Sequence, residues 1–416
     1  MEEETQPKVE VPCYFLCPIS LQMMRDPVTL PSGITYDRDG IERWLLTAGT
    51  CPLTKQPVPA DCEPTPNHTL RRLIQSWSAL HAAAGVERVP TPKPPIDRAR
   101  VAELVSRIAA TSRTTAPQEL LAALRELRDV VAESERNRKL VAAVPAAVDV
   151  LATVFVASAA TKAESVAVCD EALEIISSLQ LSEQCLARVI FETNEALVDA
   201  LVSVLQRSNT ASRAHAALIL QNVTAAMSPS RLVSLPEQVF GEVVQLIRDE
   251  VSKAATKAAL HVLVGTTSWG RNRVKAVDAG AVPVLVDILL DAPQRRACEL
   301  ALGALDRLCG CAEGRAALLA HGAGVATVGW KAFRVSDVAT DKAVRVLRSV
   351  ARHAATPAVV QEMAHTGVVG TLCAVALSEY CAERTRERAR ETLRRHARAW
   401  RTSPCLHHHL QAMYPC

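Results

Sequence analysis

The pattern of apolar and polar positions changes along the chain near residue 98. From residue 98 to residue 401, apolar residues recur at helical spacing and helix-forming residues lie between them. Before residue 85 the pattern is mixed, with short runs that favour strands and two stretches that favour helices. Between these regions, residues 85–97 read GVERVPTPKPPID, and the four prolines favour an extended spacer. The pattern predicts a small mixed unit, a linker and a long helical region.

The first region is predicted to contain a hairpin followed by a helix. Pro27–Leu30 and Ile34–Tyr36 have the composition of short strands, and Ser32 and Gly33 between them favour a tight turn. Asp37 then provides a side chain suited to capping a helix. The apolar residues that share one face of this helix are Ile41, Trp44 and Leu45.

A loop and a second helix complete this region. Residues 51–57 read CPLTKQP, and two prolines around a polar centre suit a loop. Asn67, directly after Pro66, is a good N-cap for a helix. The apolar side of that helix is predicted to consist of Leu70, Leu73, Ile74 and Trp77.

The long helical region contains six related segments. Val282–Leu289 aligns with Val144–Leu151 and Val198–Leu205, and more loosely with runs that start at Phe240, Gly324 and Val369. The successive spacings are 54, 42, 42, 42 and 45 residues. Similar lead-ins, RNRKL from residue 136 and RNRVK from residue 271, precede two of the segments. A period near 42 with a helical pattern is typical of armadillo or HEAT arrays, and the alternative is a non-repetitive helical domain.

Composition and charge narrow the class of protein. Of the 416 residues, 49% are apolar but only 3% are aromatic, so the core must consist mainly of Ala, Leu and Val. The net charge of +3 is too small to imply a nucleic-acid partner. The 13 cysteines are scattered rather than spaced as a disulfide framework, the N-terminus lacks the apolar core of a signal peptide, and no run of about 18 apolar residues occurs. We expect a cytoplasmic protein without a transmembrane segment, with nuclear access or peripheral membrane association left open.

The Cys-Pro pair at residue 17 resembles the opening of a zinc-binding domain, but the ligands are too few. A cross-braced RING domain needs eight Cys or His ligands for two zinc ions, usually including C-x₂-C pairs. The candidates among residues 1–80 are Cys13, Cys17, Cys51, Cys62 and His68. Two zinc sites are therefore excluded and one would be poorly ligated. We expect neither a metal nor another cofactor.

An ordered set of motifs over about 70 residues resembles a U-box. These motifs are Pro12-x-x-Phe15-x-Cys17-Pro-Ile, Met24-x-Asp26-Pro-Val, Gly33-Ile-Thr-Tyr-Asp-Arg38, Ile41-x-x-Trp44-Leu, Cys51-Pro-x-Thr54 and Pro66-Asn-x-x-Leu70-Arg-x-Leu-Ile, followed by Trp77. With the repeats that follow, the chain resembles the plant U-box/armadillo ubiquitin-protein ligases. The resemblance implies a small α+β, RING-like, zinc-free U-box followed by an all-α, armadillo-like superhelical solenoid. The expected boundaries are 10–84 for the U-box, 85–97 for the linker, 98–401 for the repeats and 402–416 for a tail.

The resemblance also implies how a U-box holds its shape, with hydrogen bonds and salt bridges in place of zinc. Asp26, Tyr36, Asp37, Arg38 and Arg71 have suitable side chains, and the pairing among them stays open. The full set of residues expected to support the fold is Cys17, Asp26, Pro27, Val28, Gly33, Tyr36, Asp37 and Arg38. A nucleophilic role for Cys17 is the alternative to a core position, but no base or orienting group stands nearby in the sequence.

By motif position, the resemblance implies a docking surface for a ubiquitin-conjugating enzyme that carries ubiquitin. Its contacts would be Ile19, Leu21, Trp44 and Pro52, and Lys55 would contact the donor ubiquitin. The alternative for Ile19 and Trp44 is core packing. The array would hold a protein substrate, so the chain would need no covalent nucleophile of its own. The family further implies a role in plant stress or immune signalling.

Two other functions remain as alternatives. One is a non-catalytic adaptor whose U-box only docks. The other is an import-type armadillo receptor, which is disfavoured because the array lacks recurrent Trp and Asn positions. No P-loop, H-E-x-x-H or G-x-S-x-G motif suggests another enzyme. The Arg-rich residues 382–401 are interpreted as a solvated terminal helix rather than a site for acidic substrates or anionic lipids.

Overall fold

The computed structural model describes residues 10–59, 62–89, 96–113, 117–160, 165–179, 181–193, 196–291 and 294–401. The chain divides into two compact units. The first contains Met1–Val101 with Ala132–Leu140, and the second contains Ala102–Val131 with Val141–Cys416. The expected tail at 402–416 and part of the expected linker lie outside the described residues, and the domain boundaries stay predictions.

The first unit contains a three-stranded antiparallel sheet in the order β2-β1-β3. Its strands are β1 (Pro27–Thr29), β2 (Thr35–Asp37) and β3 (Thr65–Pro66). Val28 of β1 pairs with Tyr36 of β2 and with Pro66 of β3. The Gly33 N–H donates to the Leu30 carbonyl at 2.9 Å, and Gly33 has a φ of 79°, which glycine adopts without strain. The predicted hairpin and its turn are confirmed.

Helices α1 (Arg38–Ala48) and α2 (His68–Leu80) follow the hairpin and β3, and short 3₁₀ turns lie at Cys13–Phe15 and Ala82–Ala84. The Asn67 side chain accepts the Leu70 N–H at 3.0 Å, which confirms the predicted cap of α2. The predicted side-chain cap by Asp37 is wrong, because its carboxylate instead accepts two N–H groups from the segment before β1. Leu73 is also misplaced by the sequence pattern, since 53% of it is exposed.

The hydrophobic core of the first unit lies between the sheet, α1, α2 and the loops. Cys17 and Val28 are fully buried in it, as predicted. Ile19 and Trp44 pack against this core but stay partly exposed. Its buried members are Phe15, Cys17, Met24, Val28, Leu30, Tyr36, Ile41, Cys51 and Ile74. A core this small leaves a unit of this length with little stability in reserve.

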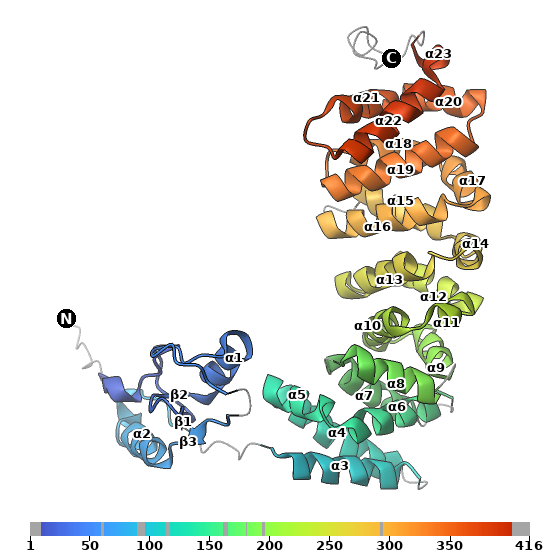
Figure 1. Ribbon diagram of the computed structural model, residues 1–416. Helices are drawn as coiled ribbons and strands as arrows, with labels where there is room; N and C mark the ends of the chain where they lie inside the picture. Colours follow the sequence, from blue (N-terminus) through green and yellow to red (C-terminus); the bar gives the residue numbers. More distant parts are fainter. Residues whose placement is uncertain are drawn as a thin grey trace, which may run out of the picture. The chain divides into compact units, whose positions relative to one another are not determined.

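From residue 98 onward the described elements are helices (Figure 1). They are α3 (Arg98–Thr111), α4 (Pro117–Glu133), α5 (Glu135–Ala142), α6 (Pro145–Ala159), α7 (Val166–Ser178), α8 (Glu183–Thr193), α9 (Ala196–Leu205), α10 (Thr210–Ala226), α11 (Pro229–Val233), α12 (Glu237–Arg248), α13 (Lys253–Thr266), α14 (Gly270–Asp278), α15 (Ala281–Asp291), α16 (Arg295–Leu308), α17 (Ala312–Ala320), α18 (Gly324–Lys331), α19 (Asp337–His353), α20 (Pro357–His365), α21 (Val368–Leu377), α22 (Glu383–Arg395) and α23 (Ala397–Trp400).

The predicted repeats are confirmed, because the six aligned segments form the successive helices α6, α9, α12, α15, α18 and α21. Each of these helices packs on the next one, and the helices α7, α10, α13, α16, α19 and α22 form a second stack. Figure 1 shows the two stacks running side by side from α6 to α22. The buried side chains are mostly Ala, Leu and Val, as the low aromatic content required. No repeat buries its apolar surface alone, so stability comes from the neighbouring repeats.

Ion pairs connect neighbouring helices of the second stack. The Asp306 carboxylate of α16 is 2.8 Å from Arg345 Nε and 3.6 Å from Lys342 Nζ, both on α19. Asp341 of α19 in turn accepts from Thr385 of α22 at 2.8 Å and pairs with Arg388. Apolar packing alone specifies the register between neighbouring repeats only weakly. These directional ion pairs fix it.

The Arg-rich segment forms two helices, α22 and α23, rather than one continuous helix. Thr385, Ala389 and Leu393 of α22 face the core, while its Arg and Glu residues pair on the outside, as the interpretation of a solvated helix requires. In the described residues, no single helix has both the length and the apolarity to cross a membrane. Two sharply bent helix pairs reach that length and apolarity when the two helices of each pair are counted together.

Candidate functional site

Two loops of the U-box have the same sequence pattern and the same backbone structure. Residues 17–22 read CPISLQ and residues 51–56 read CPLTKQ. In each loop the N–H of the first residue donates to the carbonyl of the sixth, at 2.8 Å in both. The N–H of the fifth residue donates back to the carbonyl of the first, at 2.8 and 2.9 Å. A single β-bridge closes each loop, Leu16 with Met23 and Thr50 with Pro57. The U-box therefore carries one turn twice.

The fifth residue of each loop has a left-handed backbone. Leu21 has a φ of 56° and Lys55 a φ of 58°. Residues with a β-carbon rarely adopt this conformation, and it persists where surrounding contacts enforce it. Here the two hydrogen bonds of each loop enforce it. Leu21 is 74% exposed, and Lys55 is exposed as well. Both predicted contact residues are thus presented at the tips of rigid turns.

The cysteine that opens each loop is held by hydrogen bonds. Cys17 Sγ accepts the Asp37 N–H at 3.3 Å. Cys51 Sγ lies 3.3 Å from Ser32 Oγ, which donates to it, and 3.1 Å from the Tyr36 hydroxyl. Across the described ranges, no group of three or more His, Cys, Asp or Glu side chains could hold a metal ion. Hydrogen bonds from the β1–β2 hairpin anchor both turns.

The Tyr36–Cys51 pair has a defined proton distribution. Burial raises the pKa of the Tyr36 hydroxyl well above its usual range, and the hydrogen bond to Cys51 raises it further. Burial also raises the pKa of the Cys51 thiol, but hydrogen bonds from Ser32, Thr54 and Tyr36 outweigh it and lower the pKa to about 6. Of the two groups, Cys51 is therefore the one that loses its proton first, and a Cys51 thiolate would accept from the Tyr36 hydroxyl.

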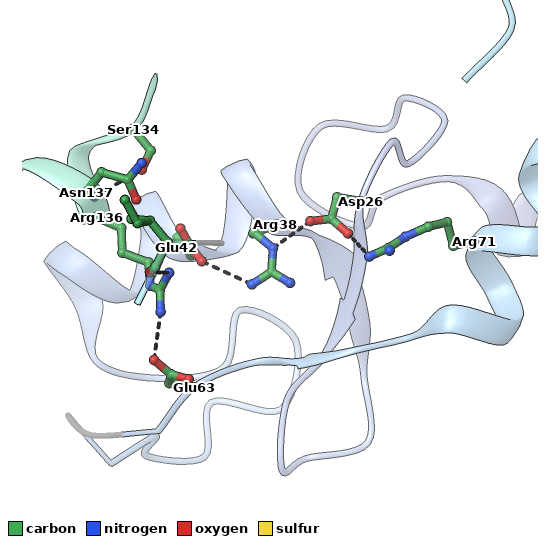
Figure 2. Close-up of polar contacts among 9 residues, drawn as sticks. Asp26, Arg38, Glu42, Glu63, Arg71, Ser134, Arg136 and Asn137 are labelled. Atoms are coloured by element: carbon green, nitrogen blue, oxygen red, sulfur yellow. Dashed lines mark hydrogen bonds and ion pairs between the residues drawn. The ribbon is translucent and has the colours of Figure 1, made fainter. Parts of the chain in front are cut away.

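A charged network around Asp26 joins the sheet to both helices (Figure 2). The Asp26 carboxylate accepts from Arg38 Nε of α1 at 2.6 Å and also pairs with Arg71 of α2. Arg38 Nη1 reaches Glu42 at 3.4 Å. The side chains of Asp26, Arg38 and Arg71 are 13–16% exposed. Buried charges are tolerated when each finds partners, so this network is a structural element in its own right.

Asp37 completes the polar framework with its side chain. Its Oδ1 accepts the N–H groups of Arg25 and Asp26, each at 2.8 Å. The backbone N–H of Arg38 donates to the Asp26 carbonyl at 2.9 Å. Asp37 thus fixes the segment that carries Asp26. The pairing among the polar residues, which the sequence left open, is Asp26 with Arg38 and Arg71, Asp37 with backbone, and Tyr36 with Cys51.

The two loops lie on either side of one face of α1. Ile19 packs close to Gly40, where a β-carbon would lie 3.8 Å from Ile19 Cδ1. Trp44 follows Gly40 one turn later on the same face. The Trp44 indole N–H donates to the Thr50 carbonyl at 2.8 Å, and Lys55 Nζ lies 5.6 Å from the centre of its ring. The structure therefore brings Ile19, Trp44 and the second loop to one surface.

The predicted contact residues differ in exposure. Leu21 and Lys55 are exposed, whereas Ile19, Trp44 and Pro52 are half-buried. Core packing and surface exposure were the two alternatives for Trp44, and the structure shows both, since Trp44 packs against the core and is only half-buried. The roles of these residues in binding stay predictions. Among the supporting residues, Pro27 and Val28 lie in β1, and Asp26, Tyr36, Asp37 and Arg38 make the contacts described above.

Sequence reasoning missed three residues of this site. Leu53 is 58% exposed and occupies the place in the second loop that Ile19 holds in the first. Ser32 is a turn residue, as the sequence predicts, and its hydroxyl also donates to Cys51. Glu42 extends the Asp26 network. The repeated pattern CPxxxQ would have identified Leu53, whereas Ser32 and Glu42 carry no sequence signal.

The second unit contains a cavity of about 750 Å³ between α12–α13 and α15–α16. Its apolar lining includes Ile247, Val284 and Ile288. The charged residues of its lining are the basic Arg248, Lys253, Lys257 and Arg296 and the acidic Glu250, Asp287 and Asp291. The mixed charges select no ligand class by themselves.

Family models match the two parts of the chain separately. A U-box domain model matches residues 11–83, and a model of the plant U-box protein ARM repeat region matches residues 100–416. Among solved structures, a designed armadillo repeat protein in complex with the peptide (KR)4 is 20% identical, with a TM-score of 0.43, over 59% of this chain and 99% of that chain.

Curated relatives are similar over their whole length. The E3 ubiquitin-protein ligase PUB23 of Arabidopsis thaliana is 44% identical over 100% of this chain and 99% of its own. The E3 ubiquitin-protein ligase PUB22 of the same plant is 40% identical over 98% of this chain and 99% of its own. The chain belongs to the plant U-box/armadillo-repeat family of E3 ubiquitin-protein ligases, and is a U-box-type ubiquitin-protein transferase.

Proposed function

We propose that the chain binds a ubiquitin-conjugating enzyme through the surface formed by residues 17–22, residues 51–56 and α1, and that its array holds the protein substrate. The observation that carries this proposal is the pair of matching turns on either side of one apolar helix face. Leu21 and Leu53 are exposed on the two loops, and Ile19 and Trp44 are half-buried against α1 and the core. Aromatic and aliphatic side chains that are rigidly held in this way are typical of interface hot spots.

The chemistry would take place on the conjugating enzyme. A lysine amine of the substrate attacks the thioester carbonyl of the bound ubiquitin, the C–S bond breaks, and the conjugating enzyme's cysteine leaves as a thiol. An isopeptide bond forms, and the proton lost by the amine balances the thiol. The chain contributes no covalent step. It holds the two reactants together, and well-oriented reactants can reach very large effective concentrations.

Lys55 would contact the donor ubiquitin. Its left-handed backbone and its position over the Trp44 ring hold the ammonium group at the edge of the proposed surface. A cation fixed in this way can select one orientation of a neighbouring protein. The Lys55→Met variant would then bind the conjugating enzyme normally but transfer ubiquitin more slowly. Equal loss of binding and transfer would show that Lys55 acts in docking instead.

The test of the proposal is chain formation in a purified system. The full chain, activating enzyme, a panel of conjugating enzymes, ATP and ubiquitin should yield ubiquitin conjugates of the chain itself. Ile19→Ala and Trp44→Ala should reduce this activity at least about tenfold, as hot-spot truncations do. The matched control is Leu80→Ala, because Leu80 is 79% exposed at the end of α2, outside the proposed surface. Full activity in both site variants would refute the proposed surface.

The second candidate is the docking-only adaptor. It would be favoured if no enzyme of a broad panel supported conjugate formation while Ile19→Ala still weakened binding of a conjugating enzyme. Cytoplasmic localisation rests on the cysteine pattern and on the sequence features named above, and a role in plant stress or immune signalling rests on the family resemblance. Fluorescent tagging in plant cells and a pathogen-elicitor response assay in a loss-of-function line would test them.

A further inference from the structure

Helix α18 departs from the other helices of its stack at its C-terminal end. The repeat alignment places Lys331 at the position of Leu151, Leu205, Ile247, Leu289 and Ala376, which are all buried apolar residues. Trp330 occupies the position of Val150, Val204, Leu246, Ile288 and Val375, none of which is exposed. Trp330 itself is 54% exposed. An indole is thus exposed at a position where the five aligned aliphatic side chains are buried or half-buried.

The loop after α18 presents a second aromatic ring through a strained backbone. Phe333 has a φ of 67° and is 45% exposed. A bulky residue in this conformation is an outlier that a turn or a function must explain. The Phe333 N–H donates to Thr340 Oγ1 at 3.1 Å, and Thr340 is buried in α19. This bond fixes Phe333 near the first turn of α19, where Val338 is 55% exposed.

Positive charges frame the exposed indole. The Arg334 guanidinium lies 4.7 Å from the centre of the Trp330 ring, and Lys331 Nζ lies 5.1 Å from it. Within the described part of the chain, the Arg334 side chain forms no ion pair with a carboxylate. A guanidinium that stacks on a ring keeps the N–H groups at its edge available for a carboxylate. Residues 330–338 contain one acidic residue, Asp337, in the first turn of α19.

We infer that Trp330, Phe333, Arg334 and Val338 form a docking surface for a protein segment that carries an apolar side chain next to a carboxylate. The apolar side chain would lie on the Trp330 and Phe333 rings, and the carboxylate would bind the edge of Arg334. Trp and Arg are the residues most enriched at interface hot spots, and exposed apolar patches of this kind mark interaction sites. Charge complementarity favours an acidic segment over a basic one.

This inference deepens the proposed function, because it assigns part of the array to recognition of the substrate and names the chemistry of the recognised segment. The surface lies wholly within the second unit, on α18, the following loop and the start of α19. Docking there would hold a substrate by a short linear segment and leave its lysines free to react.

The experiment selects peptides from a random twelve-residue phage library on the full chain, with counter-selection on the Trp330→Ala variant. We expect the recovered peptides to carry Asp or Glu beside an apolar residue. Synthetic labelled copies are then titrated by fluorescence anisotropy. Trp330→Ala and Arg334→Glu should each weaken binding at least about tenfold. Arg334→Glu should also restore binding of copies in which the acidic residue is replaced by Lys.

Two variants separate lost binding from lost folding. Phe333→Gly removes the ring but suits the left-handed backbone, so it should weaken binding without lowering the melting temperature. Phe191→Ala is the matched control, because Phe191 is 78% exposed on α8, away from this surface. Recovery of no such peptide, or equal affinity for the parent chain and Trp330→Ala, would overturn the inference.

A membrane surface is the competing ligand, and vesicles of phosphatidylcholine with phosphatidylserine test it. Vesicle binding that Trp330→Ala abolishes would assign the surface to lipid and overturn the peptide inference. Conjugate formation is measured in the same preparations. Activity without peptide binding would refute this inference alone. Peptide binding without activity across the enzyme panel would count against the proposed conjugating-enzyme surface alone.

Discussion

Replacement of Asp26 by Asn tests whether the charged network holds the U-box together. The amide keeps the size of the carboxylate but removes its charge, so Arg38 and Arg71 lose their shared partner. Breaking a buried ion pair from one side costs about 3–5 kcal/mol, because the remaining charges stay uncompensated. Arg38 keeps Glu42 at 3.4 Å, so we expect the lower end, about 3 kcal/mol.

That loss is a large share of the stability that a domain of this size has. The measurement is amide hydrogen exchange of the full chain, read on peptides from β1, β2 and α1, because the two units need not unfold together. A change of about 3 kcal/mol corresponds to roughly a hundredfold faster exchange through unfolding of the U-box. Peptides from α13 to α22 should exchange as before.

Arg25→Met is the matched control, since Arg25 precedes Asp26 and forms an ion pair with Glu87 in which the side chains are 67% and 80% exposed. An exposed pair contributes about 0–1 kcal/mol, so exchange should change little. The reasoning is refuted if Asp26→Asn accelerates exchange no more than Arg25→Met does.

Three further changes have expected outcomes. Because the folded-state pKa of Cys51 is lowered from 9.0 to about 6, its contribution to U-box stability should be fully present above pH 9 and be lost as pH falls through 6. Exchange protection, corrected for the intrinsic rate, should rise over this range, and Cys51→Ser should flatten the rise; an unchanged slope would contradict the assignment. Asn67→Ala should destabilise α2 by about 1 kcal/mol through loss of its cap, seen as faster exchange in residues 68–74, and equal rates would show that the cap contributes nothing. Gly314→Ala should lower the melting temperature of the array, because the new β-carbon would clash with the Leu308 carbonyl oxygen. Gly241→Ala is the control: no atom lies within 4 Å of its new β-carbon in α12, so the melting temperature should rise slightly. A fall for both variants would refute the steric argument.

The repeated helices could be predicted because their signal is local and recurs six times. The alignment of Val282–Leu289 with its five counterparts located the helices α6, α9, α12, α15, α18 and α21 without any tertiary information. The same alignment could not show that Trp330 is exposed. The left-handed backbone of Phe333 and its hydrogen bond to Thr340 of α19 come directly after α18, and both depend on how the loop packs.

At the polar residues of the U-box, too, some features follow from local sequence and others only from tertiary contacts. The turn at Gly33 and the cap at Asn67 follow from the conformational preferences of single residues, and both were predictable. Asp37 has the same preference for a cap, but its carboxylate lies next to two unpaired N–H groups of the segment before β1 and binds them instead. In this tertiary contact the Asp37 carboxylate satisfies the N–H groups of both Arg25 and Asp26, instead of an N–H group at the start of α1.

The sequence by itself determined the order of the elements, the period of the array and the shortage of zinc ligands, because composition, spacing and turn residues act over a few positions. Only the tertiary structure decided that Asp26 pairs with two arginines, that Tyr36 pairs with Cys51, and that residues 17–22 and 51–56 form matching turns beside one face of α1. Those partners are 12 to 45 residues apart. Their pairing depends on which polar groups remain unsatisfied once the core has formed, and buried polar groups must then take the partners that the fold brings to them.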